Sequence, residues 1–199
     1  MTLKPYIENG KVWLLLGLEY GKLCILDMET GEIKDYKEVN EQGKFVIEIL
    51  LPNKETAIVV YRNQICSIQK FKDEPEYFEE TNHFKSRQTH TAACVSKDAY
   101  DCNVLCISLI TGSIELYNID NEFKHFGSIQ VHINFSLHFM HPYTDGQLNG
   151  FTRGLITFSN DGRIYIWEWK ESKTGFKLDK KEDGGALQWN PFSNLDKWN

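Results

Sequence analysis

The histidine and cysteine residues are the side chains of this sequence whose types and spacing could bind a metal. Three residues separate His90 from Cys94, and three separate Cys102 from Cys106. Such pairs suggest zinc, which prefers imidazole and thiolate ligands in proteins. Cys106, however, lies inside an apolar run, residues 104–109, and nothing else in the sequence points to a common centre. We therefore expect thiols buried in strands, with no metal and no cofactor.

The familiar catalytic motifs do not occur in this sequence. There is no glycine-rich phosphate loop, no Gly-x-Ser-x-Gly, no His-Glu-x-x-His and no Cys-x-x-Cys. Serine, histidine and aspartate are all present, but their spacing gives no reason to unite them at one site. We expect a protein that is not an enzyme.

Composition favours a folded protein that binds neither nucleic acid nor a membrane. Of the 199 residues, 41% are apolar and 13% aromatic, which is enough to form a core. The net charge is −6, and Lys and Arg do not cluster. No apolar run approaches the length of about 18 residues that spans a bilayer. The five cysteines are odd in number and favour a reducing compartment, the cytosol or the nucleus.

The elements that must position these side chains are indicated by the stretch Gly154 to Trp169. An apolar, β-branched run, residues 155–158, leads into Asn160-Asp161-Gly162, and a second apolar run begins at Ile164. Asp-Gly between two such runs is a strong signal for a tight turn between antiparallel strands. The stretch therefore predicts a β-hairpin.

The same hairpin pattern occurs three more times, which predicts a repeat protein. Taking the turn residue as the origin, apolar residues recur two, four and five places later. The turns fall at Gly21, Asn63, Gly112 and Gly162, separated by 42, 49 and 50 residues. In the second copy Asn63 stands where the others have glycine, and it retains access to left-handed backbone geometry. These spacings are close to the period of about 40 to 45 residues that is typical of four-stranded propeller blades.

The fourth copy resembles the end of a WD repeat. Asp161-Gly162 is followed by Ile164-x-Ile166-Trp167, and Glu168 stands where the family usually carries aspartate. The resemblance covers about residues 5–170 and implies an all-β propeller with about four blades. Seven-bladed rings are the rule in this family, and the first repeat is short at its front. The chain is therefore expected to form part of a larger ring or of a ring that a partner completes.

The resemblance also implies structural roles for several residues. WD repeats carry a Gly-His pair before the innermost strand, and its buried histidine joins a network with a turn aspartate and a strand serine or threonine. His132, preceded by Val131, stands at this place, and His90 is its counterpart one repeat earlier. The residues assigned structural roles are His90, His132, Gly21, Asn63, Gly112, Asp161, Gly162 and Trp167. The alternative is a propeller enzyme, or a small-molecule or peptide binder, in whose central channel His90 and His132 converge.

Three segments fall outside the repeat pattern. Residues 72–87 contain five acidic residues, and they are expected to form a solvated loop or a docking loop that uses Tyr77 and Phe78. The sequence divides into propeller repeats (1–170), a charged linker (171–185) and an aromatic tail (186–199). Trp189, Phe192 and Trp198 of the tail are expected to contact either a partner or an open blade edge of their own chain.

Together these features predict a non-enzymatic scaffold. Propellers offer rigid rims and loops that bind peptides and proteins, and the sequence shows no catalytic motif that would compete for such a surface. We expect a subunit of a multiprotein complex, with other proteins as its partners and with a second chain that completes the propeller as one version of this arrangement.

Overall fold

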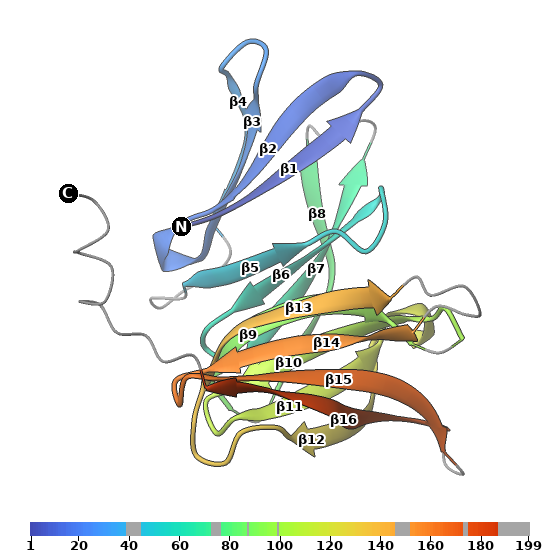
Figure 1. The fold of residues 1–199 in the computed structure, drawn as a ribbon. Helices are drawn as coiled ribbons and strands as arrows, with labels where there is room; N and C mark the ends of the chain where they lie inside the picture. The colour runs from blue at the N-terminus through green and yellow to red at the C-terminus, as the bar shows by residue number, and fades with distance from the viewer. Residues whose placement is uncertain are drawn as a thin grey trace, which may run out of the picture.

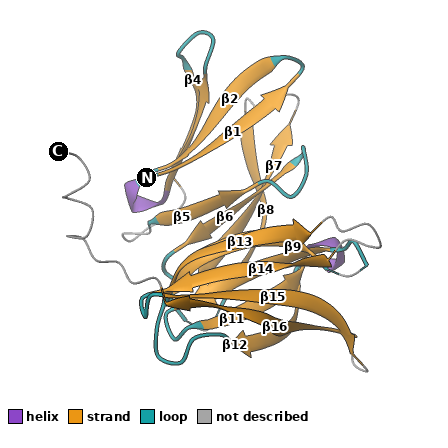
Figure 2. Ribbon diagram, viewed as in Figure 1, coloured by secondary structure: helices purple, strands orange, loops and turns teal. Residues whose placement is uncertain are grey.

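The computed structural model of the chain describes residues 1–38, 45–72, 77–86, 88–98, 100–145, 152–172 and 175–186. Strands make up almost all of it, as Figures 1 and 2 show, and two 3-10 helices, η1 (Glu19–Gly21) and η2 (Ile119–Asn121), interrupt them. Within these ranges, no helix has the length and apolar character that crossing a membrane requires.

The strands form four antiparallel sheets of four strands each, and we call the sheets blades 1 to 4. Blade 1 contains β1 (Thr2–Glu8), β2 (Lys11–Gly17), β3 (Lys22–Asp27) and β4 (Ile33–Glu38). Blade 2 contains β5 (Val46–Leu50), β6 (Thr56–Tyr61), β7 (Ile65–Lys72) and β8 (Tyr77–Lys85). Blade 3 contains β9 (His90–Lys97), β10 (Asn103–Leu109), β11 (Ser113–Asn118) and β12 (Lys124–Gln130). Blade 4 contains β13 (Leu137–Asp145), β14 (Thr152–Ser159), β15 (Arg163–Ser172) and β16 (Gly175–Ala186).

Within each blade, the order of the strands in space follows their order in the chain. Each blade is therefore a simple antiparallel meander, which needs only short turns between neighbouring strands. This is the blade of a β-propeller, and the all-β fold with four blades that the sequence predicts is confirmed.

The predicted hairpin turns join the second and third strands of each blade. Gly21, Gly112 and Gly162 have φ angles of 72°, 80° and 75°, in the left-handed region that glycine tolerates best. The second turn corrects the sequence interpretation, because its left-handed residue is Gln64, with a φ of 80°, and not Asn63. The origin of this repeat therefore moves by one residue.

This shift restores the apolar pattern of the second repeat. Counted from Gln64, the residues two and four places later are Cys66 and Ile68, and both are buried. Counted from Asn63, the fourth place fell on Ser67, which broke the pattern. Cys24 and Cys66 are consequently not at equivalent positions. All five cysteines are free thiols.

Three other expectations about elements are wrong. The first repeat is not short at its front, because β1 pairs with β2 along its whole length, from Thr2 to Glu8. The expected loop 72–87 contains β8, and the expected linker 171–185 contains most of β16. Both are fourth strands of their blades. An outermost strand lies at the sheet edge and does not need the apolar residues that identify inner strands in a sequence.

The core lies between the blades and consists of three clusters. One joins blades 1 and 2 around Trp13, Leu15 and Tyr61, and a second joins blades 2 and 3 around Val60 and Leu105. The third joins blades 3 and 4, and its members include Cys106, Leu116, Leu155, Trp167 and Trp169. Each cluster joins consecutive blades, and none of the clusters formed by described residues joins blade 4 to blade 1. The four blades form a partial propeller, with blades 1 and 4 at its ends (Figure 1).

Substitution of Gly112 tests how the turns are packed. A Cβ at this position would overlap the carbonyl oxygens of His132 and Phe135, and the φ of 80° disfavours any other residue. We expect Gly112→Ala to lower the free energy of unfolding by about 2 to 4 kcal/mol in urea melts. Gly10 is a matched control, because its φ is 78° but a Cβ there would meet nothing within 4 Å. Gly10→Ala should cost only the backbone strain, about 1 kcal/mol. Equal losses in the two variants would contradict the proposed overlap.

Candidate functional site

The hairpin turns and the connections between blades form one rim of the propeller, which we call the turn rim. Backbone hydrogen bonds join the turns of blades 2, 3 and 4 to connections. Arg62 N–H donates to Phe45 O at 2.9 Å, and His132 N–H donates to Gly112 O at 3.0 Å. Asn160 N–H donates to Ser136 O at 3.1 Å. The turns and connections are therefore fixed to one another and not only to their own strands.

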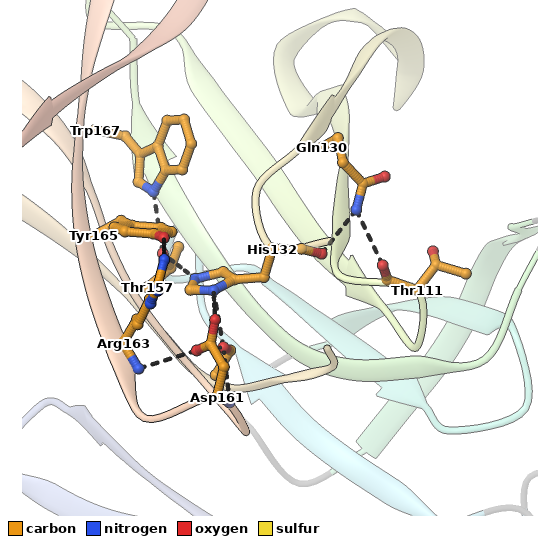
Figure 3. Close-up of polar contacts among 9 residues, drawn as sticks. Thr111, Gln130, His132, Thr157, Asp161, Arg163, Tyr165 and Trp167 are labelled. Atoms are coloured by element: carbon orange, nitrogen blue, oxygen red, sulfur yellow. Dashed lines mark hydrogen bonds and ion pairs between the residues drawn. The ribbon is translucent and has the colours of Figure 1, made fainter. Parts of the chain in front are cut away.

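The connection between blades 3 and 4, residues 131–136, is fixed most completely on its blade 3 side. The Gln130 side chain donates through Nε2 to Thr111 O at 3.0 Å and to His132 O at 2.8 Å (Figure 3). Within the connection, Asn134 has a φ of 63°, in the left-handed region where asparagine is among the residues tolerated best after glycine. The Gln130 side-chain amide therefore ties the connection to the turn of blade 3.

His132 ties the same connection to blade 4. Its side chain is buried, and its Nδ1 lies 2.8 Å from Ser159 Oγ and 3.3 Å from Asp161 Oδ2. Nε2 lies 3.4 Å from Thr157 Oγ1, which accepts a hydrogen bond from Trp167 Nε1 at 3.0 Å. Figure 3 shows the imidazole between the Asp161 carboxylate and the strand that carries Thr157.

The chemistry of the donors and acceptors determines which atom donates each hydrogen in this network. The Trp167 indole can only donate, so Thr157 accepts from it and donates its own hydroxyl hydrogen to His132 Nε2. His132 then carries its hydrogen on Nδ1 and donates it toward Ser159 and Asp161. Ser159 Oγ also donates to Asp161. The Tyr165 ring stacks on the imidazole, with the ring centroids 4.5 Å apart.

Asp161 is the negative end of this network. Partial burial raises its pKa, but hydrogen bonds from Ser159, from the Arg163 N–H and from His132 outweigh this effect and hold the pKa below its usual range. The carboxylate is therefore ionised near neutral pH and can anchor the imidazole. The network supports the turn rim, and both imidazole nitrogens of His132 are engaged in hydrogen bonds and are not free for catalysis.

His90 is also buried at the turn rim, but its side chain makes different contacts. Nδ1 lies 2.7 Å from Tyr61 O, and Nε2 lies 2.6 Å from Ser86 Oγ. Tyr61 belongs to blade 2, and Ser86 belongs to the segment that leaves it. The turn of blade 3 has Thr111 before its glycine where the turn of blade 4 has Asp161, so it has no aspartate for His90 to contact. His90 thus bonds back to the preceding blade, whereas His132 bonds forward. Burial lowers the pKa of His90 to about 4, although the hydrogen bond to the Tyr61 carbonyl acts in the opposite direction.

The innermost strands of all four blades line a central groove of about 290 Å³. Its lining includes Lys4, Glu48, His138 and His141 but neither His90 nor His132, which lie under the turn rim. Burial raises the pKa of Glu48, and Lys4 opposes this rise. The convergence of His90 and His132 on the channel, which the alternative reading required, is therefore wrong, because His90 begins β9, His132 precedes β13, and their rings bond to different blades. Among the described residues, no group of three or more metal-ligating side chains comes together.

The turn rim exposes large apolar side chains that the sequence interpretation missed. The exposed fraction is 74% for Ile133 and 52% for Ile110, and Phe135 is also exposed. Ile133 and Phe135 lie in the connection that Gln130 and His132 fix in place. Tyr20 and Phe45 are exposed at the turn rim of blades 1 and 2. A large apolar residue inside a predicted turn or connection was the signal that could have identified them.

The side chains of the five residues predicted to bind partners are outside the described part of the structure. Trp189, Phe192 and Trp198 lie outside the described residues. Tyr77 and Phe78 belong by their backbone to β8, and their side chains are outside the described set. A partner-binding role for all five residues stays a prediction. Phe84 of the same strand packs on Tyr117 of blade 3, with the ring centroids 4.7 Å apart.

Comparisons with known proteins support the architecture and go no further. No protein-family model matches the chain, and no curated protein matches it. Among solved structures, the chain is similar to the crystal structure of BBS1N in complex with ARL6DN, soaked with mercury, with a TM-score of 0.64 and 11% sequence identity. The match covers 90% of this chain and 54% of the other, so the chain spans about half the length of that protein. At this identity the likeness shows the β-propeller fold alone.

Replacement of Thr157 tests the buried network. Thr157→Val keeps the shape of the side chain but leaves the Trp167 indole N–H and His132 Nε2 without their partner. We expect the free energy of unfolding to fall by about 1 to 3 kcal/mol. Thr111→Val is the control, because the Thr111 hydroxyl bonds to Gln88 at an exposed position, and its removal should cost less than about 0.5 kcal/mol. A similar loss in both variants would show that the network contributes nothing beyond an ordinary surface bond.

His90 predicts how stability depends on pH. The pKa of His90 is about 4 in the folded protein and near 6.5 in the unfolded chain, so the unfolded state binds more protons between these values. The free energy of unfolding should therefore fall as the pH decreases from 6.5 to 4, by about 3 kcal/mol at most. In His90→Gln the decline over this window should be shallower, as measured by urea melts at several pH values. A His90→Gln variant that keeps the wild-type slope would contradict this assignment.

Proposed function

We propose that the chain is a non-enzymatic protein-interaction scaffold, a WD-repeat-like subunit of a multiprotein complex. The observation that carries the proposal is the connection 131–136, a rigidly held loop that exposes Ile133 and Phe135 to solvent. An apolar side chain held outward by a fixed backbone loses little conformational freedom when a partner covers it.

The turn rim has the composition of a docking surface. Its exposed large apolar residues are Tyr20, Phe45, Ile110, Ile133 and Phe135. Aromatic and large aliphatic side chains form the buried centre of most protein interfaces. Exposed residues on loops above a rigid scaffold are also where binding function concentrates.

Two further observations support the WD-like character and the partner class. The contacts that link Trp167, Thr157, His132 and Asp161 correspond to the network that the WD resemblance implies. The similar solved structure has a β-propeller fold, and its title describes BBS1N in complex with ARL6DN. By analogy we assign proteins as the partners of this chain. Its five free thiols suit a reducing compartment, the cytosol or the nucleus.

A double variant of the turn rim tests the proposed function. Ile133→Ser with Phe135→Ser removes the exposed apolar groups without touching the buried network, so the melting temperature should stay within about 2 °C of wild type. Proteins that co-purify with the wild-type chain from cells, identified by mass spectrometry, should be depleted at least about tenfold. Phe126→Ser is the matched control, because Phe126 is exposed on the outer strand β12, away from the turn rim. Unchanged recovery of partners with the turn-rim variant would reject this surface as the docking site.

The central groove supports a second candidate, a small-molecule or peptide binder. Its volume of about 290 Å³ and its four ionisable side chains from blades 1, 2 and 4 are the observations in its favour. Glu48→Gln combined with His141→Gln alters the groove and leaves the turn rim intact. Loss of a bound ligand in this variant, with full recovery of protein partners, would favour the groove over the turn rim.

A further inference from the structure

The two ends of the partial propeller each present an unusual sheet face. In the inner blades, the second strand is buried on both faces: every residue of β6 and β10 after the first is buried. In the end blades burial alternates. Residues 13, 15 and 17 of β2 are buried, whereas Leu14 and Leu16 are only half-buried. In β14, Leu155 and Thr157 are buried, and Ile156 and Phe158 are half-buried.

The half-buried and exposed residues of blade 1 form one apolar face. Cross-strand pairs show which side chains share it: Leu3 with Leu16, Ile7 with Val12, and Leu14 with Leu26. The exposed fraction is 65% for Ile7 and 41% for Val12. The run Val12-Trp13-Leu14-Leu15-Leu16 is continuously apolar, which is typical of a strand buried on both faces. The sequence of β2 is therefore suited to a neighbour that the described blades do not provide.

Blade 4 presents the opposite type of face at the other end. Ile156 pairs with Ile166, and Phe158 pairs with Ile164, so all four point away from blade 3. Ile164 and Ile166 lie two and four residues after the turn at Gly162. The residues at these places in blades 1 and 3 are buried against the following blade; they are Leu23, Ile25, Ile114 and Leu116.

These two faces are the two halves of one blade–blade interface. We call the face of a blade that packs on the following blade its forward face, and the face that packs on the preceding blade its backward face. Every internal interface joins the forward face of one blade to the backward face of the next. The forward face of blade 4 and the backward face of blade 1 remain, and both belong to the same chain. In this structure the arc does not join its own two ends within the described residues, but two arcs can join at both places and bury both faces. Eight blades lie within the range of about four to eight that propellers form.

We propose that two copies of this chain associate head to tail into a closed eight-bladed ring. Blade 4 of each copy packs on blade 1 of the other through the apolar rows described above. Each contact pairs two unlike faces, and a twofold axis that coincides with the central axis of the ring relates the two contacts to each other. The proposal is independent of the turn-rim function, because Ile133 and Phe135 do not belong to either end face.

Two charged double variants test the pairing, with the full chain and sedimentation equilibrium over a concentration series. The wild type should have the mass of two chains. Ile7→Asp with Val12→Asp places charge on the blade 1 face, and Ile164→Asp with Ile166→Asp places it on the blade 4 face. Because each interface then contains a buried charged half, each variant alone should dimerise at least about tenfold more weakly. Ile133→Asp with Phe135→Asp, on the turn rim, should keep the dimer.

The mixture of the two end variants gives the sharpest result. A mixed pair can join the unaltered blade 1 of one copy to the unaltered blade 4 of the other, while its second interface, charged on both halves, stays open. The mixture should therefore form dimers at lower protein concentrations than either variant alone. If only the blade 1 variant lost its dimer, the two copies would pair through blade 1 alone, and the proposal would be wrong. A wild-type chain that stays monomeric at all concentrations, or that forms an open series of larger species, would also overturn it.

Circular dichroism ensures that loss of association is not loss of folding. All variants should keep the wild-type β-sheet spectrum and a cooperative melt. If an aspartate variant unfolds, serine at the same positions provides a milder change, and the same mixing experiment applies. Failure of the ring with intact partner binding at the turn rim would reject this inference and leave the proposed function standing.

Discussion

The burial of sheet faces between neighbouring blades is the constraint on which the rest of this structure depends. A propeller blade is a four-stranded sheet with two apolar faces, and neither face can be covered from within the blade. The three clusters that hold the chain together lie between blades, built from residues such as Leu15, Val60 and Cys106. Stability is therefore a property of adjacent blades, and the end blades inherit an apolar face without a described neighbour.

Hydrogen bonds at the turn rim fix the register of neighbouring blades, which apolar contact alone does not determine. Apolar packing is not directional, so it can hold two blades together without fixing their register. His132 and Gln130 supply that direction between blades 3 and 4, and His90 supplies it between blades 2 and 3. The two histidines achieve it differently, because only blade 4 carries an aspartate in its turn. The same polar contacts hold the exposed Ile133 and Phe135 in place, so the support of the fold and the proposed docking surface share one set of bonds.

The two surfaces proposed for association differ in their physical origin. The turn rim exposes side chains from turns and connections, whose apolar character contributes nothing to the described core. The end faces expose residues from regular strands, in positions that are buried wherever a neighbouring blade exists. The turn rim is thus exposed because its residues lie outside the blades, whereas the end faces are exposed because no neighbouring blade is described beside them. A ring closed by a second copy would cover the end faces and keep the turn rim open to other proteins.

The resemblance to WD repeats implied the place of His132 beside a turn aspartate. The sequence by itself determined the repeat, its all-β character and the hairpin turns at Gly21, Gly112 and Gly162. These features are local, since alternation of apolar residues and left-handed turn geometry act over a few neighbouring residues. Tertiary structure decided the rest. Backbone geometry placed the second turn on Gln64 and not on Asn63, and pairing at a sheet edge made strands of the polar segments β8 and β16. Contact between blades directed His90 to Tyr61 and Ser86, and it decided which apolar faces are covered, because a strand of given sequence is buried only where another blade lies against it.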